Sequence, residues 1–280
     1  MKKTYQINAI KTYTRNKTIS ISERTSRSTS LLNSFFVNSS NVFLFIFKII
    51  KNTFSPEFEF KEFLKHCFQI GNKSFTLISV TGAIIGLVLT IQSRPVLIKF
   101  GALNMLPNMV TISLIREMGP VITALICAGK IGSSMGAELG SMRVTEQIDA
   151  MEVSSANPIK FLIVPRVLAA MLMIPILSIY ADAMGILGSW IGINIKGDLN
   201  FFLFISQAFG KVEFMDLLPA VIKSFFFGAV IGLVGCYKGF NAGRGTESVG
   251  VAANTAVVTA SFLVILVDLI AVQITDLFIS

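Results

Sequence analysis

Long runs of apolar residues, separated by short polar segments, dominate the chain after residue 70. The first run is bounded by Lys73 and Arg94, which enclose twenty residues without a charged side chain. A helix of that length crosses the ~30 Å of hydrocarbon in a bilayer. Four more apolar runs follow, at about residues 110–140, 167–195, 217–238 and 251–278. The pattern therefore predicts an all-α integral membrane protein with about five transmembrane helices.

Less regular segments precede the first run. Residues 31–50 are apolar but interrupted by Asn and Ser, which favours a helix lying in the headgroup plane over a spanning one. The segment 57–66, EFEFKEFLKH, places apolar side chains on one face and charges elsewhere, so we expect it to lie along the membrane surface too. Residues 31–70 are thus predicted to form amphipathic interfacial helices ahead of a membrane domain of residues 71–280.

The first thirty residues are rich in Lys, Arg, Ser and Thr and contain a single acid, Glu23. This composition is typical of a basic disordered tail and equally of an organelle transit peptide. Near the other end of the chain, we expect residues 196–216 to be a polar connection between the third and fourth spans.

A polar interruption, residues 130–165, separates the second and third apolar runs. In its first half, Gly132, Gly136 and Gly140 are spaced four apart, so one helix face carries no side chains and another helix can approach closely. Its second half has charged residues at three-residue spacing, which puts them along one side of a short helix with Ile148 and Met151 as apolar anchors beside them. The charged residues are Arg143, Glu146, Asp149 and Glu152. We interpret this as a docking helix between spans 2 and 3, followed by a new helix start at Asn157 and Pro158.

The charge distribution agrees with a membrane protein. Only 14% of the 280 residues are charged and 53% are hydrophobic, which excludes an ordinary soluble domain. The net charge of +8 comes from residues 1–73, which hold twelve Lys or Arg against four Asp or Glu. A basic segment ahead of the first span predicts a cytoplasmic or stromal amino terminus and places the docking helix on the same side. An anionic lipid surface accounts for this charge more simply than nucleic acid does, so no nucleic-acid partner is expected.

Several kinds of chemistry have no support in the sequence. The P-loop pattern GxxxxGK[ST] is missing, so ATP is not expected to bind this chain in that way. The only histidine, His66, precedes the spans, which argues against Ser-His catalysis. Cys67, Cys127 and Cys236 lie far apart, without the spacing of a metal site or a disulfide framework. We expect neither a catalyst nor a bound cofactor or metal.

Charged residues inside the apolar runs are candidates for function because they are costly in a membrane. Arg116 and Glu117 are adjacent and lie toward the outer end of the second span, where they could meet a lipid headgroup or form an internal charge pair. Asp182, Lys223 and Asp268 could pair between spans 3, 4 and 5, or act as an ion relay. The residues alone leave these alternatives open.

Three long segments resemble the MlaE (YrbE) family of ABC-transporter permeases, and the likeness covers about residues 70–280. They are LIREMGPVITALICAGKIGSSMGAELGSMRVTEQIDAMEV, NPIKFLIVPRVLAAMLMIPIL and KSFFFGAVIGLVGCYKGFNAGRGTESVGVAANTAVVTA. The chain differs in having Ser155 where the family usually has glycine and Asn157 where it usually has an acid. The Phe-, Ile-, Asn- and Lys-rich remainder is similar to the plastid-encoded branch, which implies the inner envelope of a plastid; a bacterial inner membrane is the alternative.

The resemblance implies partners and site residues. Such permeases form a homodimer on two separate ATPase subunits, with MCE-domain lipid-binding proteins on the other face, and move phospholipid-like molecules. The ATPase-coupling helix of the family corresponds here to Arg143, Glu146, Gln147, Asp149, Ala150 and Glu152. The family's lipid path passes near the residues matched by Arg116 and Glu117. The rival functions are an ion-coupled secondary transporter and a membrane scaffold without transport.

Overall fold

The computed structural model describes residues 40–53, 58–195, 197 and 199–279. The chain divides into two compact units, residues 1–50 and 51–280. The predicted basic tail of residues 1–30 lies outside the described residues. Residues 40–53 are helical. All further description concerns the second unit, in which the described residues form helices and no strands.

The first long helix is α2 (Phe60–Lys99), with Pro95 near its end. From Phe60 onward, the segment that we expected to lie along the membrane surface is continuous with this helix. The assignment of residues 31–70 to the interface stays a prediction, and residues 31–39 are not described. The structure adds that the end of this segment and the first span share one helix axis.

The second long helix contains two turns of π-helix. It comprises α3 (Leu106–Ser113), α4 (Gly119–Cys127) and α5 (Ser133–Val144). A 3₁₀ turn, Leu103–Met105, precedes it, and π-helical turns Leu114–Met118 and Ala128–Gly132 join its parts. A π turn inserts one extra residue into a helix and is frequent at functional sites. Arg116 and Glu117 lie in the first π turn, and Lys130 lies in the second.

The remaining elements complete five candidate spans. After the short α6 (Gln147–Val153), a π turn (Ile159–Ile163) leads into α7 (Val164–Asn194). The last helices are α8 (Phe201–Phe209), α9 (Phe214–Phe240) and α10 (Thr246–Ile279). Five helices, or continuous helical stretches, of the described chain are long and apolar enough to cross a membrane. The predicted five-helix membrane fold with a short helix between spans 2 and 3 is confirmed.

The prediction of a polar connection at residues 196–216 was wrong, because α8 lies within it. Phe204 and Ala208 of α8 are fully buried and pack in one cluster with Leu106 and Val110 of α3. The side chain of Asn200 caps α8 by accepting a hydrogen bond from the Phe202 N–H at 3.1 Å. A nine-residue apolar helix is too short to cross a bilayer, so a search for spans passes over it.

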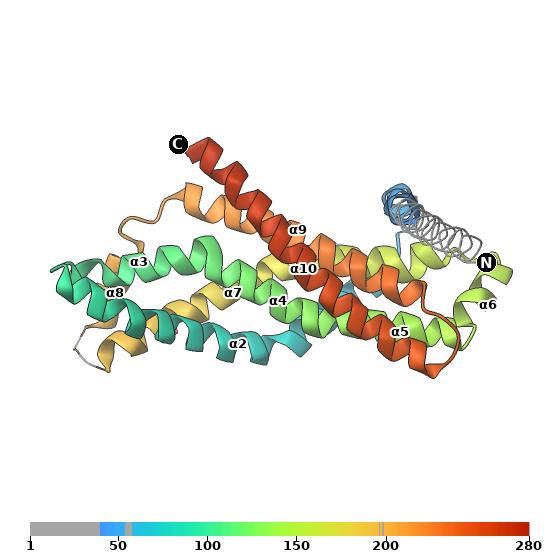
Figure 1. The fold of residues 1–280 in the computed structure, drawn as a ribbon, viewed down its shortest axis with the longest axis horizontal. Helices are drawn as coiled ribbons and strands as arrows, with labels where there is room; N and C mark the ends of the chain where they lie inside the picture. Colours follow the sequence, from blue (N-terminus) through green and yellow to red (C-terminus); the bar gives the residue numbers. More distant parts are fainter. Residues whose placement is uncertain (1–39, 54–57, 196, 198, 280) are drawn as a thin grey trace, which may run out of the picture. The chain divides into compact units, whose positions relative to one another are not determined.

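Backbone contact through glycine holds the bundle together. Along the seam where α2 packs against α7 (Figure 1), a Cβ atom at Gly86 would overlap the backbone of Gly185. A Cβ atom at Gly188 would likewise overlap the carbonyl of Ala83. The two helices therefore pack at a separation that only glycine permits. This seam fixes the first and third spans relative to each other.

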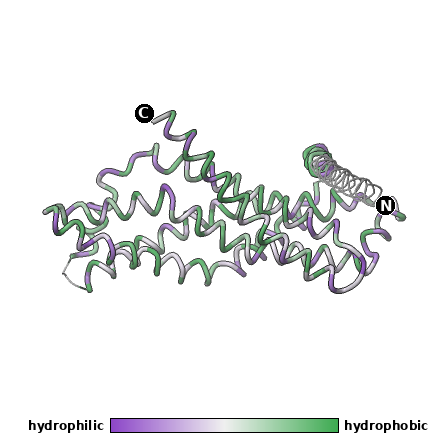
Figure 2. The backbone as a smooth tube through the Cα atoms, in the orientation of Figure 1, coloured by the Kyte–Doolittle hydropathy of each residue, from purple (hydrophilic) through white to green (hydrophobic). Residues whose placement is uncertain are grey.

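Apolar residues line both the inside and the outside of the bundle. Figure 2 shows hydrophobic positions along the length of the long helices. The helix α10 is the least buried of the five spans and exposes Val258, Phe262 and Leu269. Large exposed apolar faces of this kind are covered by lipid or by another membrane chain.

Candidate functional site

The predicted docking segment is built from two helices. The helix α5 ends at Val144, and α6 begins at Gln147. Between them Glu146 adopts a left-handed conformation with φ of 58°, and the Thr145 hydroxyl donates to the Ser141 carbonyl at 2.9 Å. The prediction that four charged residues line one side of a single helix was therefore wrong. Arg143 belongs to α5, because the left-handed residue reverses the chain before α6 begins.

Internal contacts hold α6 against the bundle. Ile148 is fully buried, so this predicted anchor faces the protein's own core. Arg143 forms an ion pair with Asp149, and its guanidinium carbon lies 6.0 Å from the centre of the Phe240 ring at the end of α9. Arg143 thus joins α5, α6 and α9, and the position of α6 is tied to two spanning helices.

The outer face of α6 is exposed and acidic. Glu146, Gln147, Ala150 and Glu152 are all exposed, and Val153 is 87% exposed at the end of the helix. This face offers two carboxylates and one apolar side chain to a partner. Of the six residues assigned to ATPase coupling, these four lie on the surface, while Arg143 and Asp149 pair with each other.

The chain after α6 makes a tight turn. Ser155 has a φ of 61°, a left-handed conformation that glycine adopts more easily than serine. The Asn157 side chain then accepts hydrogen bonds from the N–H groups of Ile159, at 3.1 Å, and Lys160, at 3.4 Å. The predicted helix start at Asn157 and Pro158 is confirmed.

Arg116 and Glu117 belong to a network of charges that joins three spans. The Arg116 Nε donates to Asp216 Oδ1 at 2.6 Å, and Lys223 Nζ donates to Glu117 Oε2 at 2.8 Å. Lys223 also donates to Asp268 Oδ1 on α10 at 3.1 Å. The expected pairing between the fourth and fifth spans is confirmed for Lys223 and Asp268.

The network has a buried side and an open side. The side chain of Lys223 is 5% exposed, whereas those of Arg116 and Glu117 are 47% and 42% exposed. The inner charges are therefore neutralised within the protein, and the outer pair remains accessible. This arrangement is compatible with both alternatives for Arg116 and Glu117, the internal pair and contact with a headgroup.

Asp182 stands apart from this network. It is buried on α7, where its Oδ1 atom has no hydrogen-bond partner among the described residues. Its carboxylate lies against Gly119, because a Cβ atom at that position would overlap Oδ1. No ion pair joins it to Lys223 within the described part of the chain. The idea that Asp182 pairs with Lys223 is not supported.

A groove runs between α9 and α10 beside the network. It has a volume of about 580 Å³, and Lys223 lies in its wall. The rest of the lining is almost entirely apolar and includes Leu218, Ile222 and Phe226 of α9 and Val267, Ile270 and Ile274 of α10. An apolar groove next to accessible charges suits an amphipathic ligand.

Gly132, at the end of the second π turn, and Gly136 and Gly140 of α5 face α9 and α10 at different separations. A Cβ atom at Gly136 would lie 3.2 Å from the Ala252 carbonyl oxygen, which is tighter than an ordinary contact. A Cβ atom at Gly140 would lie 3.5 Å from Val249, and one at Gly132 would lie 3.9 Å from Ile231. Gly136 is therefore the position at which a side chain is least tolerated.

Asp216 is a partner that the sequence analysis did not find. It was assigned to the end of a polar connection, but it is buried in the first turn of α9 and accepts from Arg116. Its Oδ2 atom also accepts from the Glu213 N–H at 2.9 Å, which completes a capping box. The local signal was the spacing of Glu213 and Asp216, which is typical of a helix start.

Comparison with known proteins gives a consistent result. The family model described as Permease MlaE matches residues 63–274. A probable ABC transporter permease protein of Rickettsia prowazekii is 36% identical over 87% of this chain and 93% of its own length. A probable ABC transporter permease protein of Pyropia yezoensis is 32% identical over 83% and 88%. The intermembrane phospholipid transport system permease protein MlaE of Haemophilus influenzae is 36% identical over 74% and 80%.

Proposed function

The chain belongs to the MlaE family of permeases, and on that premise we propose how this multi-pass membrane protein is driven and what it moves. It is the permease subunit of an ABC transporter for phospholipid-like molecules, and it is not itself an enzyme. ATP hydrolysis is assigned to a separate subunit. The observation that carries the proposal is the exposed acidic face of α6, on a helix fastened to two spans.

The exposed face of α6 is the docking surface for the ATPase. An external subunit can shift a membrane bundle between two states only through contacts that differ between those states. Glu146 and Glu152 offer charges to that subunit, and Val153 offers an apolar contact. Arg143 links α6 to α5 and α9, so a displacement of α6 would be transmitted into the spans.

The lipid path is assigned to the open side of the charge network. The guanidinium of Arg116 is half exposed and can donate to a phosphate group. The apolar groove between α9 and α10 lies next to Lys223, within reach of the same network, and suits acyl chains. The ion pairs to Asp216 and Lys223 give Arg116 and Glu117 a structural role as well.

A second copy of the chain is proposed as a partner. The exposed apolar face of α10 is of the kind that another membrane helix covers. An MCE-domain lipid-binding protein on the opposite face and a location in the plastid inner envelope, with a bacterial inner membrane as the alternative, rest on the family resemblance. Cell fractionation with antibodies to envelope and thylakoid markers tests the location.

Charge reversal on α6 tests the docking assignment. We expect the tagged double variant Glu146→Lys and Glu152→Lys to insert normally and to lose the co-purifying ATPase, because both acids are exposed and neither pairs with a basic side chain of the described residues. The matched control is Glu247→Lys, an exposed acid in the first turn of α10. Retention of the ATPase by the double variant would overturn the docking assignment.

The two rivals predict different results. An ion-coupled secondary transporter needs no ATPase, so the unmodified chain should purify without one. The separation of Asp182 from the charge network also weakens the proposed ion relay. A scaffold without transport should be indifferent to the double substitution of Arg116 and Glu117 by Gln, whereas a permease whose lipid path includes them should lose transport.

A further inference from the structure

A second cavity of about 280 Å³ lies between α2, α5 and α7, apart from the charge network and the α9–α10 groove. Its lining contains more polar and charged side chains than that of the groove, and these include His66, Lys73, Ser74, Lys130, Glu138 and Arg166. The cavity is several times larger than the ~30 Å³ that a water molecule occupies in the liquid. It therefore has room for a group of several heavy atoms.

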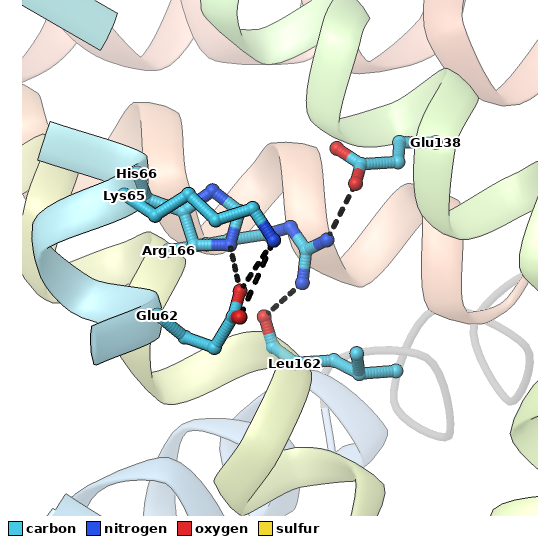
Figure 3. Close-up of polar contacts among 6 residues, drawn as sticks. All are labelled: Glu62, Lys65, His66, Glu138, Leu162 and Arg166. Carbon is cyan, nitrogen blue, oxygen red and sulfur yellow. Dashed lines mark hydrogen bonds and ion pairs between the residues drawn. The ribbon is translucent and has the colours of Figure 1, made fainter. Parts of the chain in front are cut away.

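The inner wall presents two buried polar atoms without a partner. Arg166 is 4% exposed; its Nη1 donates to the Leu162 carbonyl at 2.5 Å and its Nη2 donates to Glu138 Oε1 at 2.8 Å (Figure 3). Its Nε and the Oγ atom of the fully buried Ser74 have no hydrogen-bond partner among the described residues. A buried donor left unpaired costs about 1–3 kcal/mol. Both residues line the cavity, so a hydrogen-bond acceptor bound there would supply a partner for them.

The mouth of the cavity is positively charged. Lys73 and Lys130 are exposed there, and neither forms an ion pair with a carboxylate of the described residues. The Lys130 ammonium instead donates to the backbone carbonyl of Lys73. Glu138, already paired with Arg166, is the carboxylate in the lining, while Glu62 outside it contacts Lys65 and His66. Positive charge therefore exceeds negative charge even with His66 neutral.

Two π turns shape this arrangement. Lys130 lies in the π turn Ala128–Gly132, and Leu162, whose carbonyl holds Arg166, lies in the π turn Ile159–Ile163. A π turn changes the direction of the side chains and carbonyls around it relative to a regular α-helix. The first turn lines the cavity through Lys130 and Ile131, and the second turn holds the Arg166 side chain that forms part of its wall.

We propose that this cavity binds a phosphate group. The guanidinium of Arg166, the hydroxyl of Ser74 and the two lysine ammonium groups are the donors that phosphate oxygens accept from. Basic pockets between membrane helices are suited to the headgroups of anionic lipids. The phosphate is carried by such a lipid or is free in solution, and the experiment distinguishes the two sources. The site does not depend on the proposed transport function.

Thermal unfolding of the delipidated full chain in detergent tests the site. The probes are phosphatidylglycerol, a galactolipid without phosphate, and inorganic phosphate, each added separately. We expect phosphatidylglycerol or inorganic phosphate to raise the melting temperature and the galactolipid to have no effect. A rise with inorganic phosphate assigns the site to a soluble anion, and a rise with phosphatidylglycerol alone assigns it to a lipid.

Variants at the mouth of the cavity make the test specific. Lys73→Gln with Lys130→Gln removes two exposed charges and leaves the buried Arg166 in place. We expect it to weaken binding of the stabilising probe by at least about tenfold, the effect of losing one charge-assisted hydrogen bond. The control is Lys99→Gln, which replaces an exposed lysine at the far end of α2, the helix that contains Lys73. This variant should bind the probe normally. Equal binding by the double variant, or no stabilisation by either phosphate probe, would overturn the proposal.

Discussion

Individual residues after the docking helix show how backbone conformation constrains the sequence. Ser155 occupies a left-handed conformation, at the position where the resemblance to the family implies glycine. Such a conformation costs a residue with a Cβ atom about 1–2 kcal/mol. Ser155, which departs from that pattern, is therefore a site of local backbone strain just after α6. The exposed side chain makes the substitution sterically possible.

Replacing Ser155 by Gly should relieve that strain. We expect a gain of about 0.5–1 kcal/mol in stability, because part of the relief is offset by the greater freedom of glycine in the unfolded chain. The melting temperature of the purified variant in detergent measures it. Ser154→Gly is the matched control, since Ser154 has a φ of −77° and gains nothing from glycine. A lower melting temperature for Ser155→Gly would contradict this account.

Local chemistry decides which single residues can be predicted. The cap at Asn157 was predictable because its side chain bonds to N–H groups two and three residues away. The left-handed φ of Glu146 was not, because nothing in the residue type favours it. The partners of Lys223 lie 106 and 45 residues away, so only the packed bundle reveals them.

Among the elements, α6 has separate parts for docking and for transmission. Its exposed face carries Glu146 and Glu152, while Ile148 and the pair of Arg143 with Asp149 fix it to the bundle. Substitutions on the exposed face can therefore disturb partner binding alone, and substitutions at the contacts with the bundle can disturb transmission to the spans alone. The sequence pattern alone had put all these charges on one surface.

Loss of Arg143 should uncouple the two parts. We expect Arg143→Met to keep the ATPase bound, because the docking face is intact, and to reduce lipid transport by about tenfold or more, because the ion pair and the ring contact that link α6 to α5 and α9 are lost. The measurement is transport per ATP hydrolysed in the reconstituted complex. Lys160→Met, a basic residue beyond the turn, serves as the control. Unchanged coupling in Arg143→Met would remove this residue from the transmission path.

Element prediction succeeded where length and hydropathy agree. The five spans are each long apolar stretches, and their length and hydropathy identified them. The helix α8 was missed because it is nine residues long and lies between polar residues. The π turns were missed because an i→i+5 hydrogen bond leaves no mark on the hydrophobic pattern. These irregular elements position Arg116, Glu117 and Lys130.

At the scale of the whole molecule, Lys223 joins the second, fourth and fifth spans. Its ammonium group bonds to both Glu117 and Asp268 from a buried position on α9. Removing one member of a buried charge network leaves the others uncompensated, which costs about 3–5 kcal/mol. Lys223 therefore links charged groups of both neighbouring spans, and the pair of Arg116 with Asp216 adds a second link between the second and fourth spans.

Replacing Lys223 by Met should destabilise the bundle by about that amount, as measured by unfolding in detergent. Adding Glu117→Gln and Asp268→Asn to the same chain should recover much of the loss, because no uncompensated charge then remains. Lys211→Met, at an exposed lysine before α9, should have no effect. A loss below about 1 kcal/mol for Lys223→Met would show that the network contributes little to stability.

The membrane fold and the family of the whole molecule followed from the sequence, whereas the arrangement of its charges did not. Hydropathy predicted the spans. Three long segments that resemble the family indicated its identity, which the comparison then showed. The polar cavity around Arg166 was not predicted, because its residues come from three helices and none is unusual alone. The functional assignments of the coupling residues between Arg143 and Glu152, of Arg116 and Glu117, and of Gly132, Gly136 and Gly140 stay predictions.

Lipid transport by the purified complex tests the central claim most directly. The tagged chain, purified with the subunits that accompany it, is placed in vesicles, and movement of a fluorescent phospholipid is followed with and without ATP. We predict movement that requires ATP and that is abolished by Glu146→Lys with Glu152→Lys but not by Glu247→Lys. Phospholipid movement that continues without ATP, or that follows an ion gradient instead, would contradict the account.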